Sequence, residues 1–435
     1  MLSVGLVVGS WFYFHRPRVH QPLTLLYLAT LLEDTFGPAA VSCRIIDLRG
    51  IDSTESTEAV PECDLYLYSV SSPDFPEISS LVTELRRRYP RALHAAGGIH
   101  VHVFPEAAAR VFDCIVPGRG ERSLEVLVGD LLKGRELQPV YDLQPERDLT
   151  EYPYPRRDFL GDDQVVNDLL FKSTKVRATT VLFSRGCPFR CRFCANPEPG
   201  EILRRPLVAI RDEIDYLKRE YGIEGLSLFD EISIPLSTRQ ARPLLEILGE
   251  MNIIWRGQAR IGTPPELLNL ARESGCRELS MGVESASQQV LDIVDKRITL
   301  DQVRRTVAKC RENDIRVQIG LILGLPGEPQ NIVELTRSFV DELTPDVVML
   351  AAFCPYPGSP IANDPDYYGI RWLDPDFRHY AHLVYRFGDR EDDPATGLPF
   401  EYEPVNRWGR TFRRKEILAN LFELQAFLRE RGLNR

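Results

Sequence analysis

Short apolar runs alternate with amphipathic helical stretches along most of this chain, and this alternation limits the possible fold more than any other feature. Residues 1–140 contain five such runs, and apolar residues at spacings of three and four mark helices between them. Buried strands that alternate with helices predict a parallel sheet covered by helices on both faces. Ligands of such a sheet bind at the carboxyl ends of its strands. The five runs begin at Leu2, Cys43, Asp64, Leu93 and Cys114.

The alternation resumes from about Val176 at larger spacing. Six strand–helix units with parallel connections predict a partial barrel, whose chemistry belongs at the carboxyl ends of the strands. Proline and charged residues interrupt the pattern in residues 141–175, which we expect to be a linker. Residues 361–435 are polar, rich in aromatic residues and end in a helix, and we expect them to cover the substrate. The sequence therefore predicts an α/β protein with two successive modules, residues 1–140 and 176–360, and a helical C-terminal extension.

Charge, hydropathy and cysteine usage exclude several classes of protein. The formal net charge of −10 provides no attraction to nucleic acid, so no nucleic-acid partner is expected. No run reaches the ~18 consecutive apolar residues that cross a bilayer, so no membrane partner is expected. The nine cysteines are an odd number scattered along the chain, which predicts a reducing, cytoplasmic location rather than a disulfide framework.

Three cysteines stand together directly after a predicted buried strand. Cys187, Cys191 and Cys194 have the spacing C-x3-C-x2-C. Each thiolate of so short a loop can hold one iron of a cubane, and the fourth iron is then open to an exogenous ligand. A zinc site needs a fourth cysteine or histidine at comparable spacing, whereas no histidine lies between His102 and His379. The spacing favours a [4Fe-4S] cluster over a zinc site or three unlinked cysteines.

This loop resembles the cluster loop of the radical S-adenosylmethionine (SAM) superfamily, which has an aromatic residue before the third cysteine, here Phe193. The resemblance covers about residues 176–360. It implies that the open iron binds the amino and carboxylate groups of SAM, that Phe193 lies beside the adenine, and that one electron cleaves SAM to a 5′-deoxyadenosyl radical. It also implies a small-molecule substrate and an electron donor such as flavodoxin or ferredoxin. Catalytic residues that touch the substrate stay unassigned.

Three further motifs follow the cluster loop in the order that the superfamily has them. The second barrel strand ends in Phe-Asp230-Glu231, where family members place residues near the methionine amino group of SAM. The usual Gly-Gly-Glu is absent, so the choice between Asp230 and Glu231 is open. Gly-Val-Glu284-Ser285 is similar to the family's Gly-Ile-Glu-Ser, whose polar residues reach the ribose. Gly-Leu-Ile322-Leu-Gly-Leu-Pro-Gly-Glu resembles the family's G-x-I-x-G-x-x-x-E, which implies that Ile322 packs on the adenine.

Residues 1–140 resemble the vitamin-B12-binding domain that precedes the barrel in one large subclass of this superfamily. The resemblance rests on Gly97-Gly98-Ile-His100 and on Gly118-Arg-Gly-Glu121, among other residues. It implies a flavodoxin-like parallel sheet with cobalamin at the carboxyl ends of the strands; the alternative is a scaffold of this kind without the cofactor. The motif D-x-H-x-x-G is absent, so we expect no protein histidine on the cobalt. The expected cobalamin contacts are Ser10, Trp11, Ser69, Ser71, Gly97, Gly98, His100, Gly118 and Glu121.

Together these resemblances imply a cobalamin-dependent radical SAM enzyme that transfers a methyl group to an unactivated carbon or phosphorus in a biosynthetic pathway. The first alternative is a cobalamin-dependent radical rearrangement, ring contraction or oxidative cyclisation without methyl transfer. The second alternative is of another class, a non-catalytic iron–sulfur redox module. No residue identifies the substrate. The aromatic and histidine residues expected in its cover are Tyr367, Tyr368, Trp372, His379, His382, Tyr385 and Trp408.

Overall fold

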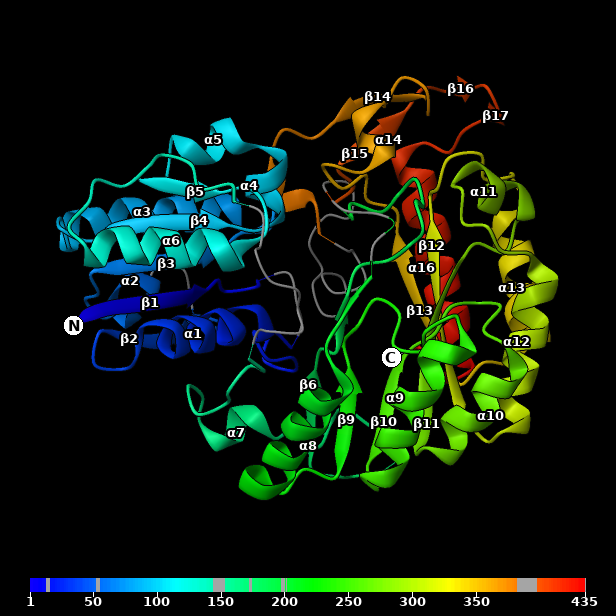
Figure 1. Ribbon diagram of the computed structural model, residues 1–435. Helices are drawn as coiled ribbons and strands as arrows, with labels where there is room; N and C mark the ends of the chain where they lie inside the picture. The colour runs from blue at the N-terminus through cyan, green and yellow to red at the C-terminus, as the bar shows by residue number, and fades with distance from the viewer. Residues whose placement is uncertain are drawn as a thin grey trace. The chain divides into compact units, whose positions relative to one another are not determined.

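The computed structural model divides the chain into two compact units (Figure 1). Unit 1 comprises residues 1–167 and 376–378, and unit 2 comprises residues 168–375 and 379–435. His382 and Tyr385, both expected in the substrate cover, lie outside the residues that the structure describes. The described residues are 1–12, 16–51, 55–143, 153–171, 174–196, 200, 202–381 and 397–434.

Unit 1 contains a five-stranded parallel sheet in the order β2-β1-β3-β4-β5. The strand order reverses between β1 and β3, as in flavodoxin-like folds, and ligands of such sheets bind beside that reversal at the carboxyl ends of the strands. The predicted α/β fold with a flavodoxin-like first module is therefore confirmed. The strands are β1 (Leu2–Val8), β2 (Val41–Asp47), β3 (Leu65–Ser69), β4 (Leu93–Gly97) and β5 (Cys114–Val116).

Helices cover both faces of this sheet, which explains why its strands read as continuous apolar runs. On one face, Leu6 of β1 belongs to a core with side chains of α1 (Leu23–Phe36) and α6 (Gly120–Leu132). On the other face, Val7 belongs to a core with α3 (Phe75–Arg88). Three shorter helices lie on the α3 side, namely α2 (Ser56–Ala59), α4 (Ile99–Val103) and α5 (Pro105–Ala109).

Part of the segment expected to be a linker packs onto unit 1. Arg157 is fully buried and donates a hydrogen bond of 2.8 Å from Nε to Oε1 of Gln21. The side-chain amide of Gln21 in turn donates to the carbonyl oxygen of Val165, at 2.7 Å, in α7 (Asp162–Val165). These contacts hold residues 153–167 on unit 1, so this stretch is an ordered part of that unit rather than a free connection.

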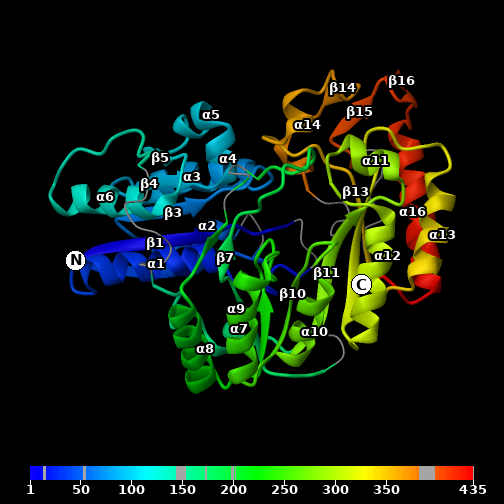
Figure 2. The same cartoon turned by 45° about the vertical axis from the view of Figure 1, so that its right-hand side comes forward.

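Unit 2 is built on a six-stranded parallel sheet in the order β13-β12-β11-β10-β9-β6 (Figures 1 and 2). The edge strands are β6 and β13, so the sheet is a partial barrel, as the sequence predicts. Its strands are β6 (Ala178–Val181), β9 (Gly225–Leu228), β10 (Ile254–Gln258), β11 (Cys276–Glu284), β12 (Arg316–Leu323) and β13 (Val347–Ala352). The helices between them are α8 (Leu207–Tyr221), α9 (Thr238–Glu250), α10 (Pro265–Glu273), α11 (Gln288–Ile293), α12 (Leu300–Glu312) and α13 (Ile332–Leu343).

The C-terminal extension adds small antiparallel pairs and a long helix to unit 2. The expected final helix is present as α16 (Arg414–Glu430), which packs against α13 and β13. The hydroxyl of Tyr402 donates to the carbonyl oxygen of Gly324 at 2.9 Å and so joins the extension to the loop after β12. No helix in the described ranges is both long and apolar enough to cross a bilayer. The short elements are α14 (Pro360–Asn363), β14 (Ile370–Leu373), β15 (Phe400–Tyr402), β16 (Val405–Asn406) and β17 (Gly409–Arg410).

Replacement of Gly98 by alanine should destabilise unit 1. Gly98 has φ +99°, and an added Cβ would lie 2.8 Å from both the amide nitrogen and the carbonyl oxygen of Val70. Backbone strain and overpacking together should cost about 3 kcal/mol. Gly134 is the matched control, because its φ of +64° is also positive but an added Cβ would meet nothing within 4 Å.

We therefore expect G98A to lower the free energy of unfolding, measured by urea denaturation, much more than G134A, which should cost about 1 kcal/mol. Equal losses in the two variants would contradict the role assigned to the contact with Val70.

Candidate functional site

The three-cysteine loop lies between β6 and α8, at the carboxyl end of the first barrel strand. A two-residue antiparallel pair, β7 (Ser184–Arg185) with β8 (Leu203–Arg204), closes the base of the loop. Within it Cys187 is half-buried, Cys191 is buried and Cys194 is exposed. The backbone N–H of Cys194 donates to the carbonyl oxygen of Cys191 at 3.1 Å, which folds the last two cysteines into a turn.

Two carboxyl groups that follow β9 hold this loop. Oδ1 of Asp230 accepts hydrogen bonds from the backbone N–H of Phe183 at 3.1 Å and from the hydroxyl of Ser184 at 2.6 Å. Oε2 of Glu231 accepts the N–H of Gly186 at 3.2 Å. Asp230 is buried, and desolvation raises the pKa of its carboxyl group to about 7, whereas the Glu231 side chain is exposed. Of the two candidates for the amino group of SAM, Glu231 is the one that solvent and ligands can reach.

Two cations beside the loop were not found from the sequence. Nζ of Lys296 forms a buried ion pair with Oε1 of Glu284 at 2.6 Å and lies 5.9 Å from the ring centroid of Phe193. The guanidinium carbon of Arg260 lies 3.3 Å from the ring centroid of Phe189. Arg260 lies two residues after the end of β10, so the rule that chemistry lies at strand ends could have identified it. Lys296 follows α11 in an irregular loop and carries no comparable signal.

These cations face the buried thiol of Cys191. Burial raises the pKa of this thiol, and the positive charges of Lys296 and Arg260 act in the opposite direction. The thiolate is the form that binds iron. Cations beside a buried thiol favour that form, so their positions suit a loop that binds metal through sulfur.

The end of β11 positions Glu284 and Ser285, the residues expected at the ribose of SAM. Glu284 has φ +73°, and its carboxylate is engaged by Lys296. A Cβ on Gly282 would lie 2.2 Å from Oε1 of Glu284, so the glycine makes room for this side chain. The buried hydroxyl of Ser285 accepts the N–H of Ser287 at 3.2 Å and supports the turn into α11. Contact of Glu284 and Ser285 with a ribose stays a prediction.

The loop after β12 is closed by Glu328. Its Oε1 accepts the backbone N–H groups of Gly324 at 2.8 Å and Leu325 at 3.2 Å. Burial raises the pKa of this carboxyl group to about 8. Ile322, which we expect to pack on adenine, is half-buried near the end of β12. Glu328 therefore fixes the backbone that follows Ile322.

In unit 1, the predicted cobalamin contacts lie at or just beyond the carboxyl ends of the strands, but several serve the chain itself. The hydroxyl of Ser10 donates to Oε2 of Glu77 at 2.5 Å, and that of Ser71 donates to Asp74 at 2.5 Å. The ring of Trp11 lies 5.1 Å from the guanidinium carbon of Arg49. Three of the residues are exposed, namely Ser69, Gly98 and Gly118. Gly97 in β4 pairs with Ser69 in β3. Glu121 is buried in the first turn of α6.

His100 is enclosed by aromatic side chains. Its ring stacks on Phe75 with the centroids 4.0 Å apart and packs edge-on against Phe377 at 5.0 Å and near Phe104 at 5.1 Å. Nδ1 lies 3.1 Å from the hydroxyl oxygen of Ser72. Burial lowers the pKa of His100 to about 4, so the imidazole is neutral at pH 7. Sequence reasoning placed His100 on this edge but did not predict Phe377, which comes from a distant segment of the chain.

The cysteine loop suits an iron–sulfur cluster better than a single zinc ion. In the described ranges, no three His, Cys, Asp or Glu side chains converge closely enough to hold one ion. The ligands of a single zinc must converge in this way, whereas a cubane spreads its thiolates over different irons. The six cysteines outside the loop are buried, as expected for small apolar side chains; they are Cys43, Cys63, Cys114, Cys276, Cys310 and Cys354.

The edge of unit 1 also suits a flat ligand. Ser69, Gly98 and Gly118 are exposed small residues at or just beyond the carboxyl ends of neighbouring strands, and the carboxylate of Asp142 lies beside Gly118. Small residues permit close approach to the backbone. Contact of this surface with a corrin ring stays a prediction.

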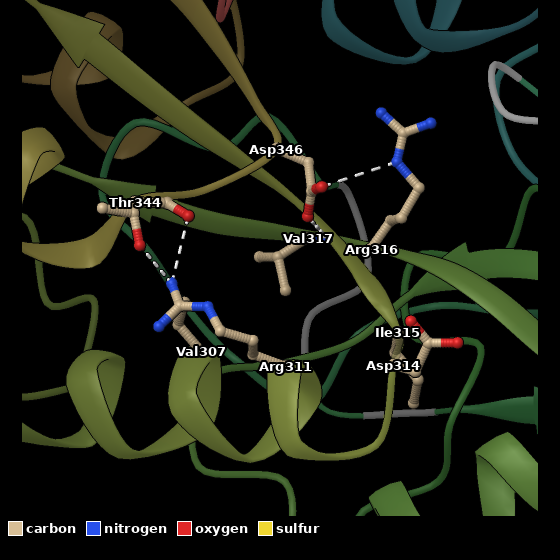
Figure 3. Close-up of a pocket in the computed structure, with 8 residues that line it drawn as sticks. All are labelled: Val307, Arg311, Asp314, Ile315, Arg316, Val317, Thr344 and Asp346. Carbon is tan, nitrogen blue, oxygen red and sulfur yellow. Dashed lines mark hydrogen bonds and ion pairs between the residues drawn. The ribbon is translucent and has the colours of Figure 1, made fainter.

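A hollow elsewhere on unit 2 is unrelated to these residues. It lies at the amino end of β12, and Figure 3 shows Arg311, Arg316, Thr344 and Asp346 around it. Arg311 donates to the hydroxyl of Thr344 at 2.5 Å, and Asp346 accepts the N–H of Val317 at 2.8 Å. These groups tie α12 and the loop before β13 together at the end of the strands opposite to the cysteine loop.

Comparison with known proteins agrees with this geometry. A family model described as the radical SAM superfamily matches residues 181–340. An uncharacterized methyltransferase from Pyrococcus horikoshii is 30% identical, over 95% of this chain and 92% of the relative. An anaerobic magnesium-protoporphyrin IX monomethyl ester cyclase from Cereibacter sphaeroides is 28% identical over 63% of this chain, which spans about half (48%) of that relative.

A solved structure has a similar fold over nearly the whole chain. The radical S-adenosylmethionine methyltransferase TsrM from Kitasatospora setae, with cobalamin and a [4Fe-4S] cluster bound, superposes with a TM-score of 0.66. The identity is 18%, and the match covers 98% of this chain and 91% of that one. The arrangement of a flavodoxin-like unit and a partial barrel in one chain is therefore shared with an enzyme of this kind.

The buried carboxyl group of Glu328 should make stability depend on pH. Its pKa of about 8 in the folded protein exceeds the value of 4.5 usual for glutamate, so the folded state keeps a proton that the unfolded chain loses. The stabilisation is complete below about pH 4.5 and is lost as the pH rises to about 8, by up to about 1.4 kcal/mol per pH unit. Glutamine has no such proton, so E328Q should remove this part of the decline.

The measurement is the free energy of unfolding in urea between pH 5 and pH 9. E334Q is the control, because Glu334 is exposed on α13. If E328Q and the wild type lose stability with the same slope, Glu328 is not protonated in the fold.

Proposed function

Because the chain belongs to the radical SAM superfamily of enzymes, we propose that it is a cobalamin-dependent methyltransferase that acts on an unactivated carbon or phosphorus of a small molecule in a biosynthetic pathway. One observation carries the proposal: a three-cysteine loop at the carboxyl end of a six-stranded partial barrel occurs in one chain with a five-stranded flavodoxin-like unit. The methyltransferase names of the Pyrococcus relative and of the TsrM structure support it. We propose residues 1–140 for cobalamin, 176–360 for the cluster and SAM, and 361–435 as the substrate cover. Of the expected linker, residues 141–175, the stretch 153–167 belongs to unit 1.

In this proposal the thiolates of Cys187, Cys191 and Cys194 hold the cluster. When bound, a reduced [4Fe-4S] cluster supplies the electron that cleaves SAM, and cobalamin supplies a carrier for the methyl group. The chain's own residues bind and orient these groups. Glu231 is exposed beside the loop and would accept hydrogen bonds from the amino group of SAM, while Asp230 keeps the loop in place from beneath.

The remaining SAM contacts would come from the ends of β11 and β12. Ser285 would face the ribose, and Ile322 and Phe193 would pack on the adenine. Lys296 neutralises Glu284, so the carboxylate can stay buried beside the cofactor without an unpaired charge. Glu328 holds the backbone after Ile322 and so fixes one side of the adenine site.

The exposed edge of unit 1 would bind the corrin ring. Ser69, Gly97, Gly98 and Gly118 would form the floor, since they bring the backbone near the surface. Ser10, Trp11, Ser71 and Glu121 would lie around it. His100 would support the floor from beneath through its contacts with Phe75 and Ser72 rather than bind the cobalt.

We further propose a reducing, cytoplasmic location and an electron donor such as flavodoxin or ferredoxin. All nine cysteines are free thiols, which suits a reducing compartment.

A cobalamin-dependent cyclisation is the second candidate function, and the cyclase from Cereibacter favours it. Products distinguish the two functions: methyl transfer gives S-adenosylhomocysteine and a methylated product, whereas cyclisation gives neither.

The first prediction concerns the cysteine loop. We expect anaerobic reconstitution with iron and sulfide to load about four irons and four sulfides per chain and to give the broad visible absorbance of an iron–sulfur cluster. The reduced protein should then release 5′-deoxyadenosine from SAM. The triple variant C187A/C191A/C194A should show neither absorbance nor 5′-deoxyadenosine, because it lacks the thiolate ligands.

C114A and C310A are the controls, because both thiols are buried away from the loop in the cores of units 1 and 2. They should retain full iron content. A triple variant that keeps its cluster would overturn the assignment of the ligands.

The second prediction concerns cobalamin. We expect anaerobic purification with hydroxocobalamin to give a roughly stoichiometric complex whose cobalt has no protein histidine, because aromatic rings enclose His100. Electron paramagnetic resonance of the cob(II)alamin form should be the same for protein grown with ¹⁴N- and ¹⁵N-histidine. A nitrogen superhyperfine splitting that changes from a triplet to a doublet with ¹⁵N-histidine would contradict the prediction. Failure to bind cobalamin would rule out methyl transfer through cobalt.

A further inference from the structure

Two cations outside the sequence motifs, Lys296 and Arg260, lie beside the cysteine loop. They differ in whether a carboxylate pairs with them. Lys296 has a carboxylate partner, Glu284, at 2.6 Å. Arg260 has no carboxylate within ion-pair distance among the residues that the structure describes. Of these two cations, Arg260 is therefore the one whose charge no carboxylate neutralises directly.

Arg260 is held in one orientation from several sides. Its guanidinium carbon lies 3.3 Å from the ring centroid of Phe189, two residues before Cys191. Nη2 donates to the carbonyl oxygen of Lys296. The guanidinium also lies close enough to Cys191 for its charge to act on the thiol. Because a planar guanidinium can stack and donate at the same time, these contacts direct a fixed cation at one sulfur of the loop.

Lys296 lies on the same side of the loop but carries its own counter-ion. Nζ is 5.9 Å from the ring centroid of Phe193, two residues after Cys191, and the ion pair with Glu284 is buried. Loss of the Glu284 charge would leave a second uncompensated cation near the same sulfur. Substitution of Arg260 therefore makes the charge beside this sulfur less positive, and substitution of Glu284 makes it more positive.

We propose that Arg260 is a positioning residue that raises the reduction potential of the [4Fe-4S] cluster through Cys191, and that Glu284 limits this effect by neutralising Lys296. The proposal rests on the proposed function, since it requires the cluster. Reduction adds one electron from a low-potential one-electron donor and breaks no bond. The reduced cluster is one charge more negative, so a cation held close to a ligand sulfur stabilises it more than the oxidised cluster.

The test is a redox titration of the reconstituted full-length protein without SAM, followed by electron paramagnetic resonance of the reduced cluster. At the potential where half of the wild-type cluster is reduced, R260Q should be reduced in clearly less than half of the molecules. E284Q should be reduced in clearly more than half. R260K keeps the charge but loses the planar guanidinium that stacks on Phe189, so its midpoint should lie between those of R260Q and the wild type.

The matched control is R304Q, because Arg304 is an arginine on the outer face of α12 that pairs with Glu342 and Asp301. Its midpoint should equal that of the wild type. A fully loaded R260Q with an unchanged midpoint would overturn the proposal, as would R260Q and E284Q shifting in the same direction. Loss of the cluster from a folded R260Q would also overturn it, since Arg260 would then retain the cluster rather than set its potential.

Failure of the proposed function has a different signature. In that case the wild-type protein itself would not assemble a cluster, and the titration would have no signal in any variant.

Discussion

The geometry of the cysteine loop depends on one buried carboxyl group. Asp230 follows β9 and accepts hydrogen bonds from Phe183 and Ser184, the residues that lead into the loop. Because the parallel sheet fixes the end of β9, it also fixes the start of the loop. The pKa of about 7 shows how much desolvation opposes the charge of this side chain. The contact persists because the carboxyl group satisfies two donors that would otherwise be buried without a partner.

The same arrangement recurs along the carboxyl end of the barrel. Glu328 closes the loop after β12 through two backbone N–H groups, and Glu231 binds the N–H of Gly186. Glu284 is paired with Lys296. Acidic residues at strand ends are usually interpreted as ligand contacts, but here each of them also holds protein structure. Substitutions at these positions will therefore change loop geometry as well as any direct contact with a cofactor, and binding measurements need conservative replacements such as glutamine.

In unit 1, packing within the protein explains part of the sequence motif. Gly98 has to be glycine because of Val70, whose backbone would lie 2.8 Å from an added Cβ. His100 is fully buried against Phe75 and Phe377. The Gly-Gly-Ile-His motif therefore shapes the chain at the end of β4 through contacts within the protein, those of Gly98 with Val70 and of His100 with Phe75. The exposed position of Gly98 therefore follows from packing within the motif itself.

The sequence by itself determined the two parallel sheets, most strand and helix positions, and the three-cysteine loop, because strand alternation, helical spacing and ligand spacing are local patterns. Only the tertiary structure decided which charges meet. Arg260 and Lys296 reach Cys191 from loops far apart in the sequence, and Phe377 joins the core around His100 from a segment more than two hundred residues away. Their spacing along the chain carries no signal. Electrostatic and aromatic contacts depend on distance in space, and that distance is fixed only when the sheets have formed.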